Sequence, residues 1–326
     1  MKKKIAIILT IIMMFVMISG CSTKNSSSSN KKVKVLFSVS DASDNYRKLL
    51  VTNAKSYADS QNIELTIMDA AGSIETQVTH MKEAVSGGYD AIICAPVDPV
   101  TALQLKKDAE GLPIVFLNSS PDDSVLKKDK YIYVGSDEKV AGQYQAEYIA
   151  DYLKNKNDLK VVLIKGEKGH SATKGRTNAV KETFKEKGIN AQYVFEDNAN
   201  WSRQQAKDMF NVFLSTGQKF DCVIANNDEM ALGVIDSFKE NNIDPSSVPI
   251  VGIDATPEGC KAIADGSMKL TVYQSAKGQS KSSVDAAIQL GSGRTLTNME
   301  NMDKEGKHIW VPFEKVSKEN VNKYMS

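Results

Sequence analysis

The chain has 326 residues, of which 41% are hydrophobic and 25% are charged, and its formal net charge is +1 at pH 7. Removal of an N-terminal export signal would take away Lys2, Lys3 and Lys4 and change this charge to −2, which gives no electrostatic basis for binding nucleic acid. The four cysteines lack paired or metal-type spacing, which argues against a disulfide framework and against a zinc site.

The first 32 residues predict export and attachment to a membrane. Three lysines precede an uncharged, mostly apolar stretch from Ile5 to Ile18, which is shorter than the roughly 20 residues of a spanning helix. Residues 1–20 are therefore predicted to be a lipoprotein signal peptide and Cys21 the lipidated residue, with a short uncleaved anchor as the alternative. Residues 21–32 are typical of a flexible tether. We expect an extracytoplasmic lipoprotein, and the scarcity of arginine among the basic residues indicates a Gram-positive source.

Strand and helix signals alternate along the rest of the chain. The first series has apolar, β-branched runs at 33–39, 63–68, 91–95, 114–117 and 131–135, with amphipathic helices at 46–61, 74–85 and 101–110. The second series has runs at 161–164, 192–195, 222–225, 250–253 and 270–273, with helices near 140–154, 173–187, 203–213, 229–241 and 257–265. A helix at 278–290 and a short strand at 309–311 follow. Such alternation requires parallel sheets.

These elements predict an α/β protein with two doubly wound parallel-sheet lobes, because a mature chain of about 300 residues usually divides into two domains. The first lobe is expected to hold residues 33–135 and about 275–306. The second is expected to hold residues 136–274 and about 307–326. The segments that cross between the lobes would form a hinge.

Polar or aromatic side chains follow many of the predicted strands. Side chains at the carboxyl ends of parallel strands face the ligand crevice of such a sheet. The candidates are Asp44, Asn45, Tyr46, Asn118, His170, Arg176, Trp201, Asn227, Asp254 and Gln274. Carboxylates, amides and a guanidinium group suit a ring of hydroxyls, each of which both donates and accepts, and aromatic rings suit its apolar faces. The pattern predicts a binding site for a sugar-like small molecule.

Several of these residues have a simpler structural explanation. Asp44 and Asp254 could cap the helices that begin near Tyr46 and Pro257. Trp201 could belong to the hydrophobic core. Arg176 and His170 could be solvated residues at the start of a helix.

The sequence carries no motif of a common enzyme class. The first strand ends in Ser38–Asp41 rather than in a G-x-G-x-x-G loop, and neither a Walker lysine motif nor a G-x-S-x-G elbow occurs. Cys94 and Cys222 lie inside apolar strands and are expected to be buried, inert thiols. His80 and His308 are expected at the surface. We therefore expect no catalytic residues and no cofactor.

Seven stretches, taken in order, carry a resemblance to a known family. They are Ser43–Tyr46, Ala95–Pro99, Val115–Asn118, Tyr133–Asp137, Lys165–His170, Val223–Asp228 and Gly252–Glu258. The mature chain resembles the periplasmic galactose/glucose-binding proteins within the wider ribose-binding-like, type I family of periplasmic sugar-binding proteins. The resemblance implies that the ten candidate residues bind the ligand, with Tyr46 and Trp201 stacking on the two faces of a sugar ring.

Two positions depart from the galactose/glucose pattern. An aspartate that stands two residues after the histidine in those proteins is Ala172 here, and an asparagine is replaced by Gln274, as in the ribose branch. The resemblance therefore leaves an aldohexose, such as galactose or glucose, and a pentose, such as xylose or arabinose, as alternative ligands. The family's calcium loop would fall at 153–160, which has one carboxylate among three lysines, so no metal site is expected.

The resemblance also implies a membrane partner. A closed, liganded form would deliver its monosaccharide to a permease of the ATP-binding-cassette (ABC) type. Alternatively, it would signal to a membrane histidine kinase or chemoreceptor. Both uses require only that the ligand biases closure of the lobes. We favour transport by a monomeric protein that contacts the membrane through Cys21 and binds no nucleic acid.

Overall fold

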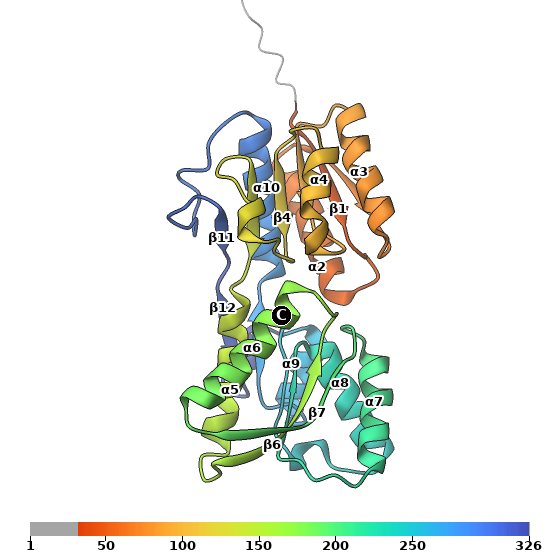
Figure 1. Ribbon diagram of the computed structural model, residues 1–326, viewed down its shortest axis with the longest axis vertical. Coiled ribbons are helices and arrows are strands. Elements are labelled where there is room, and N and C mark those ends of the chain that lie inside the picture. Colours follow the sequence, from red (N-terminus) through yellow and green to blue (C-terminus); the bar gives the residue numbers. More distant parts are fainter. Residues whose placement is uncertain (1–31, 326) are drawn as a thin grey trace, which may run out of the picture. The chain divides into compact units, whose positions relative to one another are not determined.

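The computed structural model describes residues 32–325. The predicted signal peptide, Cys21 and nearly all of the predicted tether lie outside the described residues. From Val33 onward, the described residues form one compact unit, which contains two lobes that are each built on a separate sheet (Figure 1).

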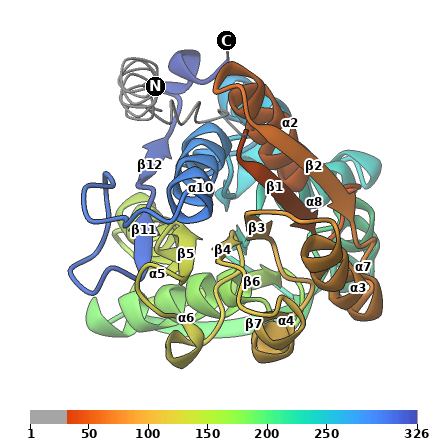
Figure 2. The ribbon, with the colours of Figure 1, turned by 90° about the horizontal axis from the view of Figure 1, so that it is seen from above.

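The first lobe is a six-stranded parallel sheet in the order β11-β5-β4-β3-β1-β2. Its strands are β1 (Lys34–Val39), β2 (Glu64–Asp69), β3 (Ala91–Cys94), β4 (Ile114–Leu117), β5 (Tyr131–Gly135) and β11 (His308–Trp310). Helices α3 (Ile74–Ser86) and α4 (Ala102–Asp108) cover one face, and α2 (Asn45–Ser60) and α10 (Ala276–Gly291) cover the other (Figure 2).

The side chains of β1 show why its sequence is a continuous apolar run. Val35 and Phe37 pack in the core shared with α2 and α10, whereas Leu36 packs in the core shared with α3 and α4. All three side chains are fully buried. A parallel strand with helices on both faces has no solvated side, so it does not alternate apolar with polar residues.

The second lobe is a parallel sheet in the order β7-β6-β8-β9. Its strands are β6 (Asp158–Lys165), β7 (Asn190–Asn198), β8 (Cys222–Ala225) and β9 (Ile250–Val251). β10 (Thr271–Gln274) continues it through single parallel bridges near β9 and pairs with antiparallel β12 (Phe313–Val316). Helices α5 (Glu138–Tyr152) and α6 (Ser171–Glu186) cover one face, and α7 (Arg203–Ser215), α8 (Asp228–Glu240) and α9 (Pro257–Asp265) cover the other. Short 3-10 helices lie at Pro99–Thr101, Asp123–Val125, Pro245–Ser247 and Val321–Lys323.

The chain passes between the two lobes at three places: between β5 and α5, between β10 and α10, and between β11 and β12. The third crossing falls later than the sequence predicts. Residues 308–310, which the sequence places in the second lobe, pair as β11 with β5 of the first sheet. The short strand is held by the sheet edge of the first lobe, a long-range contact that local sequence does not encode.

The predicted α/β fold with two parallel-sheet lobes is confirmed, with small differences at the element ends. The expected strand at 250–253 pairs with β8 over Ile250 and Val251 only. Cys94 and Cys222 are buried, as predicted. The prediction for His80 is wrong, because this histidine is buried in α3 and its Nδ1 lies 3.0 Å from the Ser38 hydroxyl. Within residues 32–325, no helix has the length and apolar character needed to cross a membrane.

Candidate functional site

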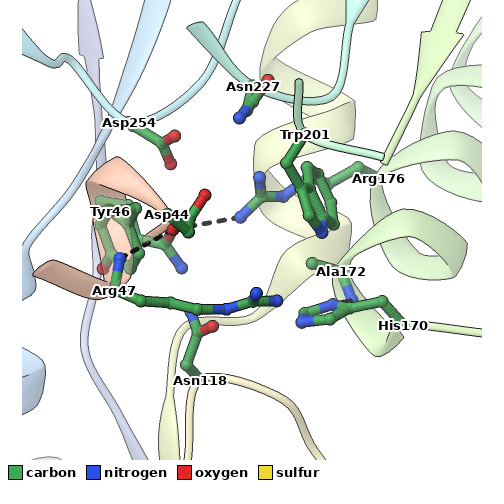
Figure 3. Close-up of a pocket in the computed structure, with 11 residues that line it drawn as sticks. Asp44, Tyr46, Arg47, Asn118, His170, Ala172, Arg176, Trp201, Asn227 and Asp254 are labelled. Carbon is green, nitrogen blue, oxygen red and sulfur yellow. Dashed lines mark hydrogen bonds between the residues drawn. The ribbon is translucent and has the colours of Figure 1, made fainter. Parts of the chain in front are cut away.

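One cavity gathers the side chains that follow strands of both sheets (Figure 3). About 320 Å³ of space between its atoms belongs to it, part of which is open to solvent. Nine of the ten predicted residues line it, and two further residues complete the lining. The full set is Asp44, Tyr46, Arg47, Asn118, His170, Ala172, Arg176, Trp201, Asn227, Asp254 and Gln274. Because α2 and Asn118 belong to the first lobe and the residues from His170 to Gln274 to the second, both lobes contribute to the cavity.

Asn45 is the one predicted residue that does not line this cavity. Its side chain is exposed, and its Nδ2 donates a hydrogen bond of 3.0 Å to Oε1 of Glu229 on α8. Asn45 is the first residue of α2, and the helix turns it away from its neighbour Tyr46. The structure therefore gives Asn45 a contact between the lobes beside the cavity.

Three of the lining residues cap a helix and face the cavity at the same time. Asp44 Oδ1 accepts from the backbone N–H of Arg47, and Asn227 Oδ1 accepts from that of Met230. His170 Nδ1 accepts from the backbone N–H of Ala172. Each cap satisfies one free N–H group in the first turn of a helix and fixes the rotamer of the capping side chain. Capping and ligand contact are thus compatible roles, because each side chain keeps a second polar atom.

The cap also fixes the protonation of His170. Since Nδ1 accepts a hydrogen bond, the ring proton of the neutral imidazole lies on Nε2. Burial, with the nearby charges of Arg47 and Arg176, lowers the pKa of His170 well below its usual value. His170 is therefore a neutral hydrogen-bond donor at physiological pH.

Asp254 does not cap a helix. Thr256 is the N-cap of α9 and accepts from the backbone N–H of Gly259. The Asp254 side chain is buried, and its backbone has a φ of 119°, a conformation that is strained for a residue other than glycine. Burial raises the pKa of Asp254 well above its usual value, although the Arg176 charge opposes this. Such a strained, desolvated carboxylate is typical of a functional site.

Asn118 and Trp201 share this backbone feature, with φ angles of 66° and 62°. Both lie in loops that follow strands and both line the cavity. Left-handed backbone costs free energy for residues with a Cβ atom, so the surrounding fold must hold these loops in place. The three strained positions therefore lie where the chain turns its side chains toward the cavity.

Arg176 is anchored by a glutamate that the sequence analysis does not identify. Its Nε donates to Glu138 Oε2 at 2.6 Å, its Nη1 to the Asn226 carbonyl at 2.6 Å and its Nη2 to Gln274 Oε1 at 3.2 Å. Glu138 is the first residue of α5 and is buried, yet it does not line the cavity. This carboxylate supplies the negative charge beside Arg176 that the alanine at position 172 does not provide.

Trp201 is both a core residue and a cavity residue. Its ring belongs to the hydrophobic core beneath α7, α8 and α9 and lies edge-on to His170, with ring centroids 5.3 Å apart. It also lies directly against Gly166, where an added Cβ atom would come within 2.0 Å of the ring. A glycine at position 166 is therefore required to seat the indole at the cavity wall.

Two aromatic polar groups at the cavity have no hydrogen-bond partner among the described residues, namely the Tyr46 hydroxyl and the Trp201 Nε1. Buried polar groups are nearly always hydrogen-bonded in folded proteins. Partners supplied by a bound polar molecule would satisfy them. Among residues 32–325, no group of three or more His, Cys, Asp or Glu side chains could hold a metal ion.

Behind the cavity, Asp228 is fully buried and accepts three hydrogen bonds, one from the Thr271 hydroxyl and two from Thr256. Burial raises its pKa from 3.8 to about 7 despite these donors. Because the pKa of Asp228 is higher in the folded than in the unfolded state, its contribution to the free energy of unfolding is complete below the unfolded-state pKa. This contribution is lost as pH rises from there through the folded-state pKa.

We expect Asp228→Asn to remove this pH dependence. In the native protein the contribution should fall with pH between about 4 and about 7, by up to about 1.4 kcal/mol per pH unit. Urea unfolding of both proteins at several pH values in this window would measure it. The free energy of unfolding of the variant, minus that of the native protein, should increase as pH rises. A constant difference between the two would show that Asp228 does not titrate in this range.

Comparison with known proteins agrees with this architecture. The family model described as a periplasmic binding protein domain matches residues 35–295 of the chain. The chain belongs to the periplasmic binding protein family. A putative rhizopine-binding protein of Rhizobium meliloti is 36% identical to this family member over 287 residues, which are 86% of this chain and 89% of the relative. A D-galactose/methyl-galactoside binding periplasmic protein of Haemophilus influenzae is 30% identical over 276 residues, which are 81% of this chain and 82% of the relative.

A solved structure is similar to this periplasmic binding protein in both sequence and fold. An ABC transporter solute binding protein from Bacillus halodurans with bound myo-inositol has 30% sequence identity and a TM-score of 0.81, with 91% of this chain and 99% of that chain covered. Such proteins bind solutes and do not catalyse reactions. The predicted family and the absence of enzymatic activity are confirmed.

Proposed function

We propose that this protein captures a single-ring polyol, either a monosaccharide or a cyclitol of similar size, and presents it to an ABC importer. One observation carries the proposal. Carboxylates, amides, an arginine fork and two aromatic rings converge from two lobes on one cavity. A ring of hydroxyls needs donors and acceptors in a fixed pattern, and its apolar faces need flat partners.

Donors and acceptors are both available for such a ring. Asp44 and Asp254 would accept from hydroxyls, and His170 Nε2 and the Asn227 amide would donate. Asn118 can do both. The remaining Arg176 N–H groups would bond a ring oxygen or a neighbouring hydroxyl, because the guanidinium is held rigidly by Glu138. Tyr46 and Trp201 would contact the two faces of the ring.

The relatives support this ligand class and leave the ligand itself open. Their names and bound molecules include galactose, ribose, xylose and myo-inositol. We retain aldohexoses and pentoses as candidate ligands and add myo-inositol, because the solved structure that holds it covers nearly the whole chain.

Membrane attachment through Cys21 is part of the proposal. A secreted binding protein without an outer membrane around it would diffuse away unless it were anchored, and lipidation of Cys21 would provide the anchor. Labelling of growing cells with a radioactive fatty acid should mark the native protein and leave Cys21→Ala unlabelled. Equal labelling of the two proteins, or no labelling of the native protein, would contradict the assignment.

We expect Ala172→Asp to change ligand preference. Ala172 lines the cavity and its side chain is 2% exposed, so an aspartate there would place a new carboxylate in the site. The ratio of affinities for galactose and xylose should shift, because a charged acceptor discriminates between hydroxyl patterns. Calorimetric titration of both sugars against both proteins would measure it. An unchanged ratio would show that position 172 does not determine specificity.

Uptake of a radiolabelled ligand tests the transport role. A strain that lacks this protein should lose uptake of the sugar that the purified protein binds. Normal uptake in that strain, together with loss of a transcriptional or chemotactic response to the sugar, would favour the sensing role instead.

A further inference from the structure

The charged side chains that line the ligand cavity are two arginines and two aspartates, namely Arg47, Arg176, Asp44 and Asp254. His170 also lines the cavity and is neutral, because burial lowers its pKa well below the usual value. If the arginines neutralised the aspartates, the cavity would suit an uncharged ring best. They do not, because each arginine is paired with a different carboxylate.

Both arginines form ion pairs with glutamates that lie outside the cavity lining. Nη2 of Arg47 lies 3.1 Å from Oε2 of Glu167, and Nε of Arg176 lies 2.6 Å from Oε2 of Glu138. The two arginine side chains are 7% and 3% exposed, so salt screens these contacts little. A carboxylate at hydrogen-bonding distance compensates most of the guanidinium charge. The two aspartates are thus left without a counter-ion on the cavity wall.

Neither aspartate has an ion-pair partner among residues 32–325. Oδ1 of Asp44 caps α2, whereas the side chain of Asp254, a residue only 7% exposed, accepts no hydrogen bond within this range. The two carboxylates are close enough to interact. Burial raises the pKa of Asp254 well above its usual value, the Arg176 charge opposes this, and the charge of Asp44 adds to the rise. A cation beside the two carboxylates would stabilise their charged forms.

Tyr46 adds a third acceptor near these carboxylates. Its hydroxyl is buried without a hydrogen-bond partner among the described residues, and burial followed by the charge of Asp254 raises its pKa. Figure 3 shows Asp44 and Asp254 on the side of Tyr46, whereas the guanidinium group of Arg47 lies beside His170. An ammonium group carries three N–H donors and no acceptor, and it is also attracted to the face of an aromatic ring. Such a group matches this side of the cavity.

We propose that the ligand is an aminated ring, either an amino sugar or an aminocyclitol, whose ammonium group lies between Asp44 and Asp254 beside Tyr46. The proposal rests on the function proposed above, in which the cavity binds a single-ring polyol. The hydroxyls of the ring face the donors of the opposite side, among them His170 and Arg176. The neutral parent ring occupies the same cavity more weakly, because a hydroxyl in place of the ammonium group gives up the attraction between opposite charges.

Calorimetric titration of matched pairs of compounds tests this ligand class. Each pair consists of galactose, glucose or myo-inositol and a form of the same ring in which an amine replaces one hydroxyl, with the amine at each ring position in turn. In the pair that fits the cavity, we expect the amine to bind about tenfold more tightly than its neutral parent. This is the difference expected between hydrogen bonds to a carboxylate from a charged and from an uncharged donor.

Three variants show whether the two aspartates cause the preference for the amine. Asp44→Asn and Asp254→Asn should each lose most of it, so that amine and neutral parent bind with similar affinity. Asparagine caps helices as well as aspartate does, so Asp44→Asn keeps the start of α2 intact. Asp208→Asn removes an exposed carboxylate from α7 of the second lobe and should keep the full preference.

The outcomes separate this proposal from the sugar-binding proposal on which it rests. A neutral parent that binds at least as tightly as its amine in every pair would overturn the aminated ligand and leave the polyol site intact. A preference for the amine that persists in both Asp44→Asn and Asp254→Asn would also overturn it, because the charge would then be recognised elsewhere. If no compound of any pair bound, the polyol site and the aminated ligand would both be wrong.

Discussion

Replacing Glu138 with alanine is expected to lower the free energy of unfolding by about 3–5 kcal/mol. Glu138 and Arg176 form a buried ion pair in which both side chains are less than one tenth exposed. Removal of the carboxylate leaves a guanidinium ion buried with only neutral acceptors, the Asn226 carbonyl and the Gln274 amide. A buried charge without its counter-ion is among the most costly defects in a folded protein.

Chemical denaturation of the native protein and of two control variants would measure this loss. Glu147→Ala removes a glutamate from the same helix, where it pairs with Lys315 at the surface, and should cost no more than about 1 kcal/mol. The double variant Glu138→Met, Arg176→Met removes both charges and should be more stable than Glu138→Ala, although it also removes the positive charge beside Asp254. If Glu138→Ala were no more destabilising than Glu147→Ala, Glu138 could not be the counter-ion that holds Arg176.

Replacing Asp254 with asparagine is expected to have opposite effects on stability and on binding. In the ligand-free protein, burial raises the pKa of this carboxyl, so a neutral side chain should raise the free energy of unfolding near neutral pH. Hydrogen bonds from ligand hydroxyls to a charged acceptor contribute about 1.5–3 kcal/mol, so affinity should fall by roughly one to two orders of magnitude. The native carboxylate would thus lower the stability of the folded protein and raise its affinity for the ligand.

Denaturation and calorimetric titration of the same preparation would show both effects. Asp208→Asn is the matched control, because Asp208 is exposed on α7 of the same lobe and should change neither quantity. If Asp254→Asn bound the ligand as tightly as the native protein, Asp254 would not be a ligand-binding residue. Lower stability in the variant would show that the native carboxylate is satisfied without ligand.

The side chains that follow predicted strands could be found from sequence, because strand periodicity locates the edge of the sheet where ligands bind. Asp44, His170, Asn227 and Asp254 are examples, and each lines the cavity. Strand periodicity could not show whether such a residue caps a helix, contacts the ligand or does both. Whether an aspartate caps a helix depends on its backbone angles, and Thr256 rather than Asp254 caps α9.

Glu138 and Arg47 were not identified because their roles depend on tertiary contacts. Glu138 begins a helix and by sequence resembles any acidic residue of a first turn, yet it meets Arg176 from another helix. Arg47 pairs with a residue of the other lobe, 120 positions away in the chain. The only local signal for Arg47 is its place next to Tyr46, in the first turn of a helix whose cap lines the cavity. The late crossing after β11 likewise depends on pairing with a distant strand.

Thermal unfolding of the chain from Ser22 onward, with and without candidate ligands, tests the sugar-binding site most directly. The panel comprises galactose, glucose, xylose, arabinose, ribose and myo-inositol, each added to the native protein and to Asp254→Asn. A ligand present at about a thousand times its Kd adds about 4 kcal/mol of stability. We expect one compound to raise the melting temperature of the native protein by several degrees and to have much less effect on Asp254→Asn. No shift with any compound, or an equal shift in both proteins, would contradict a single-ring polyol site at this cavity.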